Sequence, residues 1–336
     1  MKNLQIGIVG AGAMGSLLAH KFVSAGEQVC LIDLPARISQ IKSNGLGLIN
    51  PEGELSVVHP ANLSDNLATS GQFDLVILAT KAQTLPTLAG DLEAVIHDDS
   101  AIMTIQNGIP WWYFQGLDVN TAQFCRPPKL KNLDPEGSLE KRIASKNLLG
   151  CVAYPAAHLD EQGHVHHVEG VKFPIGELDG KTYPRTELIA QTMEKAGFKC
   201  RILDDIRSEL WLKAWGSLSF NPISALTGGT MSGICEFPNT RKLVSQMMAE
   251  AQRVGEKLGV HFRHTIEKRI QGAHAVGPHK TSMLQDREAK QAMEVEALIG
   301  SIVELGKITD VPTPAIQAVY ACLSLLDNNL QQGSAA

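Results

Sequence analysis

The first residues that could carry chemistry form a glycine-rich run, Gly10-Ala11-Gly12-Ala13-Met14-Gly15. It follows an apolar, β-branched run typical of a buried strand and opens a stretch whose apolar residues recur at helical spacing. In such a turn Gly10 permits the tight bend, Gly12 lets the backbone approach a pyrophosphate, and Gly15 lets the helix pack closely. The run predicts a dinucleotide site, for a nicotinamide cofactor rather than a flavin; a merely tight turn is the structural alternative. The expected cofactor-binding residues are Gly10, Gly12, Ala13, Met14 and Gly15.

An acid at the end of the next apolar run bears on which nicotinamide cofactor is bound. Asp33 closes the predicted strand 28–33. A carboxylate there receives the ribose hydroxyls and repels a 2′-phosphate, which favours NAD over NADP. Arg37 weakens this prediction, because it could swing toward a phosphate. Asp33 could also simply cap the turn that begins at Leu34.

Two more polar residues follow predicted strands. Lys81 comes after the run 73–79, and Asn107 comes after the run 100–105. The carboxyl ends of parallel strands form the edge where ligands of such sheets bind. Lys81 is therefore either a cofactor or substrate contact or a solvated surface lysine. For Asn107 a functional role is favoured, although turn formation would also explain the sequence Asn107-Gly108.

The second half of the chain has distinctive polar stretches of its own. The segment 209–213 ends in Lys213, and further stretches occur at 221–222, 281–286 and 293–296. On a helix Lys213 would lie near Glu209, so an exposed ion pair is its simplest structural explanation when it is considered alone.

Histidine and cysteine do not form a recognisable metal-binding pattern. His164, His166 and His167 lie in one predicted strand, but no nearby cysteine or acid completes a set, so exposed strand histidines are favoured and no metal is predicted. The six cysteines include no CxxC pair, which fits reduced thiols in a cytosolic protein that serve in packing.

Composition excludes several classes of protein. The 336 residues are 44% hydrophobic and 19% charged, with a formal net charge of -5. No Lys/Arg-rich run is present, so nucleic acid is not an expected partner. No segment approaches the roughly 18 apolar residues of a membrane span. Glycines at dinucleotide-site spacing interrupt the N-terminal apolar stretch, which argues against a signal peptide and for a cytoplasmic location.

The predicted elements form two domains. Strands at 4–9, 28–33, 73–79 and 100–105 alternate with helices at 14–23 and 85–96, which is typical of a Rossmann-type, doubly wound α/β domain over residues 1–204. Short antiparallel strands at 152–154, 163–168 and 172–176 are expected to extend the same sheet. The region 115–146 is expected to be an irregular loop. Residues 205–330 show helical periodicity throughout and predict an all-α domain, followed by a polar, frayed tail at 331–336.

Taken in order, these motifs resemble ketopantoate reductases (2-dehydropantoate 2-reductases). The resemblance spans nearly the whole chain and is most specific in the stretches 209–213 and 282–286. It implies NAD(P)H-dependent reduction of 2-dehydropantoate to (R)-pantoate, a step of pantothenate and coenzyme A synthesis. It also implies a cleft between the Rossmann domain and a helical domain of the 6-phosphogluconate dehydrogenase type.

The resemblance also implies a role for each polar residue. Lys213 would be the general acid, and Asn107 would share the substrate's carbonyl oxygen with it. Hydride addition builds negative charge on that oxygen, and an ammonium group both stabilises and protonates it. Ser282 would hold the carboxylate, Asn221 would meet the 4-hydroxyl, and Glu294 would lie near the nicotinamide and the substrate.

Two departures from the family pattern leave alternatives open. Ser217 stands where some members have a second asparagine, which motivates a different 2-oxo acid as substrate. Leu34 stands where NADPH-specific members often have an arginine, which supports Asp33 as a sign of NADH. A non-catalytic NAD(P) sensor with the same fold is the alternative of another class. The apolar helical domain makes a homodimer plausible.

Overall fold

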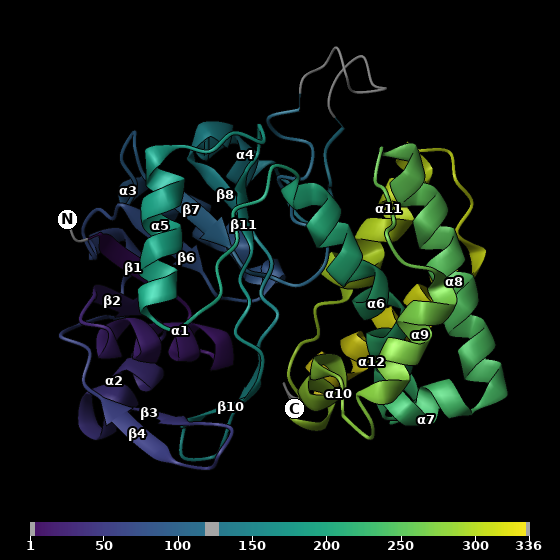
Figure 1. Cartoon of the computed structure of the whole chain (residues 1–336), viewed down its shortest axis with the longest axis horizontal. Helices are drawn as coiled ribbons and strands as arrows, with labels where there is room; N and C mark the ends of the chain where they lie inside the picture. The colour runs from purple at the N-terminus through teal and green to yellow at the C-terminus, as the bar shows by residue number, and fades with distance from the viewer. Residues whose placement is uncertain (1–3, 118–127, 334–336) are drawn as a thin grey trace. The chain divides into compact units, whose positions relative to one another are not determined.

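The computed structural model describes residues 4–117 and 128–333, which form two compact units (Figure 1). The first unit contains the described residues up to 106 together with 115–117 and 136–206. The second contains 207–333 and takes in two segments from the middle of the chain, 107–114 and 128–135. A simple division after residue 204 does not anticipate that these two segments join the second unit.

The first unit is built on a seven-stranded sheet with the order β11-β8-β7-β6-β1-β2-β5. All neighbouring pairs are parallel except β11 with β8. The predicted parallel, doubly wound sheet is therefore confirmed, as is the antiparallel strand at its edge. The strands are β1 (Gln5–Val9), β2 (Gln28–Ile32), β5 (Asn62–Ser64), β6 (Leu75–Leu78), β7 (Ala101–Thr104), β8 (Leu148–Cys151) and β11 (Ile175–Glu177).

A second sheet was not predicted. It has the order β4-β3-β10-β9, with β10 parallel to β3. The expectation that residues 163–168 extend the first sheet is therefore wrong, and residues 152–154 lie between strands. An alternating pattern identifies a strand but not its partner, and β10 pairs with a strand more than 100 residues earlier. The strands are β3 (Leu46–Ile49), β4 (Leu55–Val58), β9 (Ala156–Leu159) and β10 (Val165–Glu169).

Helix α1 lies between the two sheets, with contacts to β2 of the first and to all four strands of the second. The predicted helix at 85–96 is a 3-10 segment, Ala82–Leu88, continued by α3; Pro86 lies inside the 3-10 segment, where it has no amide to donate. The expected irregular region contains the short helix α4, and its residues 118–127 lie outside the described residues. The helices are α1 (Ala13–Ser24), α2 (Pro35–Asn44), α3 (Ala89–Ala94), α4 (Ser138–Arg142) and α5 (Pro184–Lys195), with 3-10 turns at Leu67–Thr69 and Ser145–Asn147.

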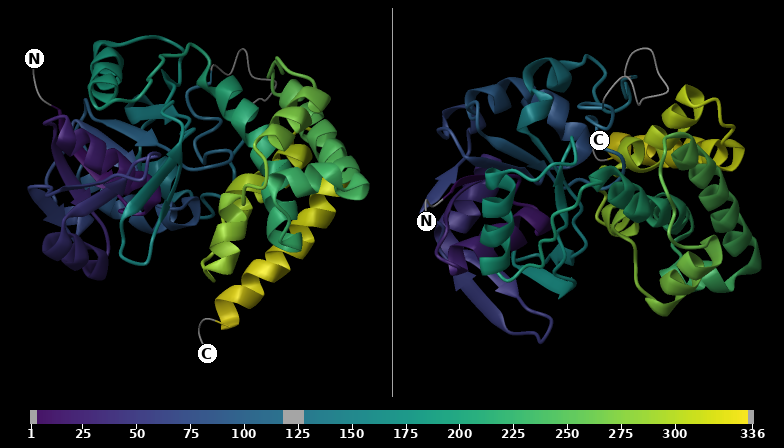
Figure 2. Two further views of the ribbon diagram at one scale, coloured as in Figure 1. Left: turned by 60° about the horizontal axis from the view of Figure 1, so that its bottom comes forward. Right: turned by 45° about the horizontal axis from the view of Figure 1, so that its top comes forward.

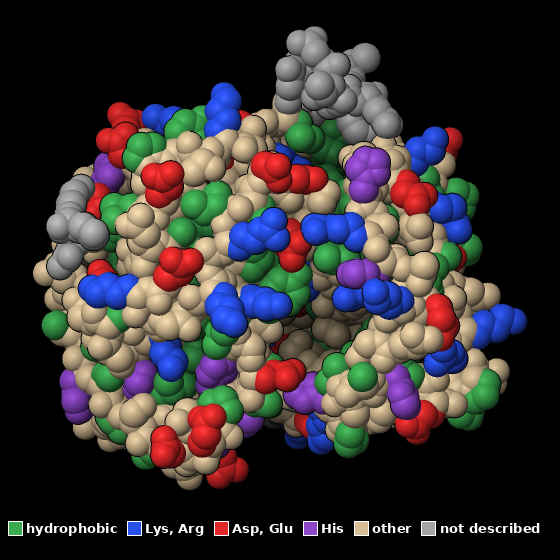
Figure 3. Space-filling view, in the orientation of Figure 1, with side chains coloured by type: hydrophobic (Ala, Val, Ile, Leu, Met, Phe, Trp, Pro, Cys, Tyr) green, Lys and Arg blue, Asp and Glu red, His purple; other side chains and the backbone are tan. Residues whose placement is uncertain are grey.

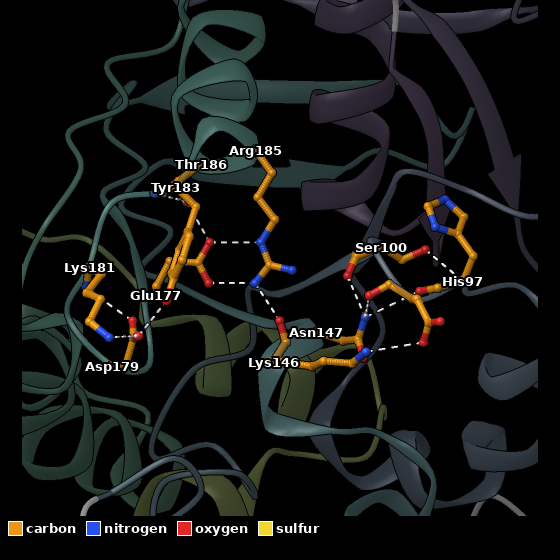
Figure 4. A network of polar contacts seen from close by, with 11 residues as sticks. His97, Ser100, Lys146, Asn147, Glu177, Asp179, Lys181, Tyr183, Arg185 and Thr186 are labelled. Atoms are coloured by element: carbon orange, nitrogen blue, oxygen red, sulfur yellow. Dashed lines mark hydrogen bonds and ion pairs between the residues drawn. The ribbon is translucent and has the colours of Figure 1, made fainter.

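A polar network stabilises the amino-terminal edge of the first sheet (Figure 4). Glu177, at the end of β11, is buried and accepts two hydrogen bonds from Arg185 at 2.9 and 2.6 Å and one from Thr186 at 2.5 Å. Asn147 Nδ2 donates to the Ser100 carbonyl at 2.8 Å, just before β7 begins. A buried carboxylate needs such partners because leaving it unpaired is costly.

Every secondary-structure element among the described residues beyond 206 is a helix or helical turn, as predicted. Helix α8 packs against α7, α9, α11 and α12. Helix α12, seen in yellow in Figure 2, continues to Gly333, so the first part of the predicted tail is helical. No helix among the described residues is long and apolar enough to span a membrane. The helices are α6 (Ile206–Thr227), α7 (Met231–Glu236), α8 (Pro238–Lys257), α9 (Ile266–Ala275), α10 (Ser282–Glu288), a π-helical turn Glu296–Gly300, α11 (Ser301–Ile308) and α12 (Pro314–Gly333).

The histidines of the β9–β10 hairpin are less exposed than the sequence indicated. His166 Nε2 lies 3.0 Å from Asp160 Oδ2, and His164 Nδ1 lies 3.5 Å from the same oxygen. His167 is buried and bonds to the Gly170 carbonyl. Within residues 4–117 and 128–333, no group of three or more His, Cys, Asp or Glu is arranged to hold a metal ion. On the face shown in Figure 3, acidic and basic side chains both occur on each unit.

One buried histidine makes the stability of the first unit depend on pH. His20, on α1, is 3% exposed, and its Nε2 lies 3.2 Å from the Ser56 hydroxyl on β4. Burial lowers the pKa of His20 from 6.5 to about 4; a hydrogen bond with the Ser56 backbone opposes this effect, and the charge of Lys21 adds to it. As pH falls, His20 takes up a proton in the unfolded chain, where its pKa is 6.5, before it does so in the folded protein. The stability that comes from burying neutral His20 is therefore complete above pH 6.5 and is lost as pH falls toward 4.

We therefore expect the free energy of unfolding to fall between pH 7 and pH 5 by about 2 kcal/mol more in the wild type than in His20→Gln, which cannot ionise. Urea titrations at both pH values measure this difference. His261→Gln, at an exposed position, is the control and should keep the wild-type difference between the two pH values. Equal losses in the wild type and His20→Gln would contradict the assignment to His20.

Candidate active site

A different structural feature explains why each of the three loop positions, 10, 12 and 15, is a glycine. Gly10 has a φ of +105°, and a Cβ there would lie 2.8 Å from the Thr80 amide nitrogen at the end of β6. A Cβ on Gly15 would overlap the Gly10 carbonyl oxygen, so α1 packs directly on the loop. Gly12, by contrast, faces open space, with nothing within 4 Å of an added Cβ. The loop is thus closed on the protein side and accessible at Gly12.

The first residues of α1 fit a dinucleotide. Gly12 is the N-cap and supplies no side-chain hydrogen bond, so the amides of Ala13 and Met14 begin the helix without a side-chain cap. Helix N-termini attract anions through these amides and the helix dipole. Beside the loop, Thr80 Oγ1 is buried and has no hydrogen-bond partner among the described residues. An unpaired buried hydroxyl and an uncapped helix start are the groups that a bound pyrophosphate would satisfy.

Asp33 is oriented by two backbone amides. Its Oδ1 accepts from the Leu34 amide at 2.6 Å, and its Oδ2 accepts from the Ala11 amide in the glycine loop. The capping role considered from the sequence is therefore present, but the carboxylate also contacts the glycine loop. A carboxylate oxygen has a second lone pair, so Asp33 can still accept a hydroxyl hydrogen. Leu34 is 73% exposed.

Lys81 and Gln106 lie just beyond the ends of β6 and β7. Lys81 is the half-buried N-cap residue of the 3-10 segment, and its cofactor contact stays a prediction. Gln106 Nε2 donates to the Leu78 carbonyl at 2.8 Å and to the Thr80 carbonyl at 2.9 Å. Gln106 thus holds the two strand ends together, a structural role that sequence reasoning did not assign.

The second unit brings together the three predicted catalytic residues. Lys213 Nζ donates to Asn107 Oδ1 at 2.7 Å, and Asn107 Nδ2 donates to Glu294 Oε2 at 3.2 Å. All three side chains are half-buried. Glu209, the alternative partner of Lys213, lies 3.5 Å from Arg263. The Asn107 amide therefore links the Lys213 ammonium to the Glu294 carboxylate: its oxygen accepts from the cation and its N–H donates to the anion.

Backbone packing fixes the position of Asn107. Gly108 has a φ of +84°, and a Cβ there would overlap the Ala297 carbonyl oxygen. That oxygen accepts from the Ile109 amide at 3.0 Å. The glycine lets the segment 107–114 lie directly on the chain that follows Glu294. The sequence suggested Gly108 only as a turn residue.

Aromatic residues of the same segment hold α6, the helix of Lys213. Trp211 Nε1 donates to Tyr113 Oη at 2.8 Å, and Arg207 Nε donates to the Tyr113 carbonyl at 2.8 Å. Tyr113 and Trp211 are both buried. Sequence reasoning missed these contacts, although the aromatic run 111–114, which begins four residues after Asn107, was a visible sign of a buried segment.

Helix α6 arranges further polar residues in line with Lys213. Ser217 and Asn221 follow it at intervals of four, so all three lie along one side of the helix, and all are half-buried. Ser282 is the exposed first residue of α10, which is capped by Thr281. The predicted contacts of Ser217, Asn221 and Ser282 with a substrate stay predictions.

Two family models match this chain, one in its N-terminal part and one in its C-terminal part. The one described as "Ketopantoate reductase PanE/ApbA" matches residues 6–111, and "Ketopantoate reductase PanE/ApbA C terminal" matches residues 205–327. A curated 2-dehydropantoate 2-reductase from Mesorhizobium japonicum is 43% identical over 324 residues, which cover 96% of this chain and 98% of the relative.

Solved structures give the same result. A proposed ketopantoate reductase from Ralstonia solanacearum aligns with a TM-score of 0.90 at 30% identity, over 98% of this chain and 99% of its own. A D-mandelate dehydrogenase in a ternary structure with NADH and anilino(oxo)acetate shares the fold, with a TM-score of 0.83 at 22% identity over 97% of this chain and 99% of its own. The resemblance seen in the sequence is confirmed: the chain belongs to the ketopantoate reductase family of oxidoreductases.

Proposed function

We propose that this protein reduces 2-dehydropantoate to (R)-pantoate with NADH and that Lys213 donates the proton. The observation that carries the proposal is the 2.7 Å hydrogen bond between Lys213 Nζ and Asn107 Oδ1. It occurs in a chain that is 43% identical to a 2-dehydropantoate 2-reductase over nearly its whole length.

A bound nicotinamide would supply the hydride, and side chains of the second unit would stabilise and protonate the negatively charged oxygen that results. Hydride addition to the ketone carbon moves the π-electron pair onto oxygen, and one proton then completes the alcohol. An ammonium group has three N–H donors, so Lys213 can bind Asn107 and the substrate oxygen at the same time. It stabilises the developing charge and is the proton source.

Asn107 and Glu294 orient the acid. Because Glu294 accepts from Asn107 Nδ2, the amide oxygen is directed at Lys213. A reversed amide would place an N–H against the ammonium and leave the carboxylate without its donor. Glu294 therefore acts on Lys213 through Asn107, in addition to its expected place near the nicotinamide.

The remaining polar residues suit the rest of the substrate. The hydroxyls of Ser217 and Ser282 and the amide of Asn221 can bind a hydroxyl or a carboxylate. Ser217 and Asn221 lie on the Lys213 side of α6, four and eight residues further along. We propose that they select the substrate's 4-hydroxyl and that Ser282 binds its carboxylate.

The first unit favours NADH over NADPH in this proposal. Asp33 keeps a carboxylate at the end of β2, and the neighbouring Leu34 presents no cation to a 2′-phosphate. Arg37 donates to protein acceptors through Nε, Nη1 and Nη2. The 2′-phosphate of NADPH would therefore be repelled by the Asp33 carboxylate, with no nearby cation reserved for binding it.

Two alternatives remain. The first is another 2-oxo acid as the substrate: it is motivated by Ser217, which replaces the second asparagine of some family members, and by the D-mandelate dehydrogenase of the same fold. A non-catalytic sensor would bind the dinucleotide without reduction. Two further expectations, a cytoplasmic location and a homodimer, stay predictions.

The first test is a steady-state assay of the purified protein with 2-dehydropantoate and either NADH or NADPH. We expect cofactor oxidation with a higher kcat/KM for 2-dehydropantoate than for pyruvate or phenylglyoxylate. A higher value for one of those acids would favour the second enzyme alternative. The absence of oxidation with every acid would leave only the sensor.

Replacing Lys213 tests the proposed acid. We expect Lys213→Ala to lower kcat/KM by about 10² or more, the scale of general acid catalysis, while the Kd for NADH from fluorescence titration stays within twofold. Lys257→Ala removes an exposed lysine from α8 of the same unit and should leave both values unchanged. Full activity in Lys213→Ala would exclude this mechanism.

Replacing Asp33 tests the cofactor preference. We expect Asp33→Ala to raise the NADPH to NADH ratio of kcat/KM about tenfold, because a charge that repels the 2′-phosphate is removed. The matched control is Asp65→Ala, which removes an exposed acid directly after β5, the strand beside β2. If the control shifts the ratio equally, the effect is one of overall charge and Asp33 has no specific role.

A further inference from the structure

Arg37, on α2, is half-buried and donates hydrogen bonds through all three of its guanidinium nitrogens. Its Nε donates to the Ala11 carbonyl at 3.1 Å, and its Nη2 donates to Ser16 Oγ at 3.2 Å and to the Gly163 carbonyl at 2.9 Å. Its Nη1 donates to Gln40 Oε1 at 2.6 Å. The guanidinium thus joins the glycine loop, α1, α2 and the turn between β9 and β10.

The contact with Ala11 holds the glycine loop at its centre. Ala11 lies between Gly10 and Gly12, and its amide donates to Asp33 while its carbonyl accepts from Arg37 and from Ser16 Oγ at 2.9 Å. Both polar groups of this residue are therefore held by side chains. The orientation of the next peptide, at the open position Gly12, depends on them.

The β9–β10 turn forms the other side of the contact. The Gly163 amide donates to the Asp160 carbonyl at 3.0 Å, and the His164 amide donates to Asp160 Oδ1 at 2.8 Å. Gln40 Nε2 adds a bond of 2.8 Å to the Gln162 carbonyl. Gly163 has a φ of +82°, and a Cβ there would overlap the Arg37 guanidinium. The turn has thus a defined shape and leaves just enough room for Arg37.

Charge also favours this arrangement. Burial lowers the pKa of Arg37, and the carboxylates of Asp33 and Asp160 on either side oppose that effect. Two acids from two different elements therefore keep the cation in place. An arginine that binds a cofactor phosphate would instead direct its planar fork toward that phosphate.

We propose that Arg37 is a positioning residue of the dinucleotide site: it holds the Ala11 carbonyl against the β9–β10 turn and so shapes the loop for NADH and NADPH alike. Arg37 is then not a ligand of the 2′-phosphate. The proposal rests on the proposed use of a nicotinamide dinucleotide, but not on the identity of the substrate.

The test measures Kd for NADH and NADPH by fluorescence titration of the whole protein without substrate. We expect Arg37→Gln to weaken both cofactors about tenfold, with their ratio unchanged within twofold. At saturating NADH, the KM for the 2-oxo acid should stay within twofold. Loss confined to NADPH would show that Arg37 is a phosphate ligand and would overturn the proposal, as would unchanged Kd values for both.

A second variant acts on Arg37 from the turn and keeps the test valid if Arg37→Gln does not fold. Gly163→Ala introduces a Cβ against the guanidinium and should weaken both cofactors in the same ratio. Gly53→Ala is the matched control, since Gly53 has a similar φ of +87° in the β3–β4 turn but open space around its Cβ position. Equal effects of the two glycine variants would contradict the proposal. A wild type that binds dinucleotides but does not reduce 2-dehydropantoate would overturn only the proposed function.

Discussion

The position of one ammonium group depends on a short peptide segment that packs against its helix. Lys213 is half-buried, and the hydrogen bond to Asn107 offsets part of the cost of removing its charge from water. The bond exists only because the segment 107–114 lies on the chain after Glu294, at a distance that a side chain at Gly108 would prevent. Tyr113, at the other end of the segment, binds Trp211 on α6. The Lys213 side chain is thus held both by Asn107 and by the packing of its own helix.

The glycine loop 10–15 follows the same principle, because polar groups of its Ala11 are held from two sides. Its glycines make the turn possible, but they also remove side chains that could stiffen it. Asp33 and Arg37 compensate by binding the amide and the carbonyl of Ala11. Opposite charges at the two ends of one residue match the dipoles of its N–H and C=O groups, so neither side chain can be exchanged for the other.

Sequence patterns predicted the elements much better than their partners. The apolar runs that became β1, β2, β6 and β7 are continuous and lie close together in the chain, so local periodicity was sufficient. The second sheet depends on pairing between β3 and β10, far apart in sequence, and was missed. His164 and His166 were treated as exposed for a related reason. Their acid, Asp160, is brought to them by the turn of the hairpin, which no strand pattern describes.

The candidate site residues show the same limit more sharply. Local spacing pairs Lys213 with Glu209, whereas the structure joins it to Asn107, 106 positions earlier. Only the family resemblance connected the two from the sequence. Arg37 is the opposite case, since its proximity to Asp33 in the chain suggested a phosphate ligand and its actual contacts include Gly163, 126 positions away. Hydrogen-bond partners of long polar side chains are set by tertiary contacts, so residue type and local spacing identify candidates but cannot assign their partners.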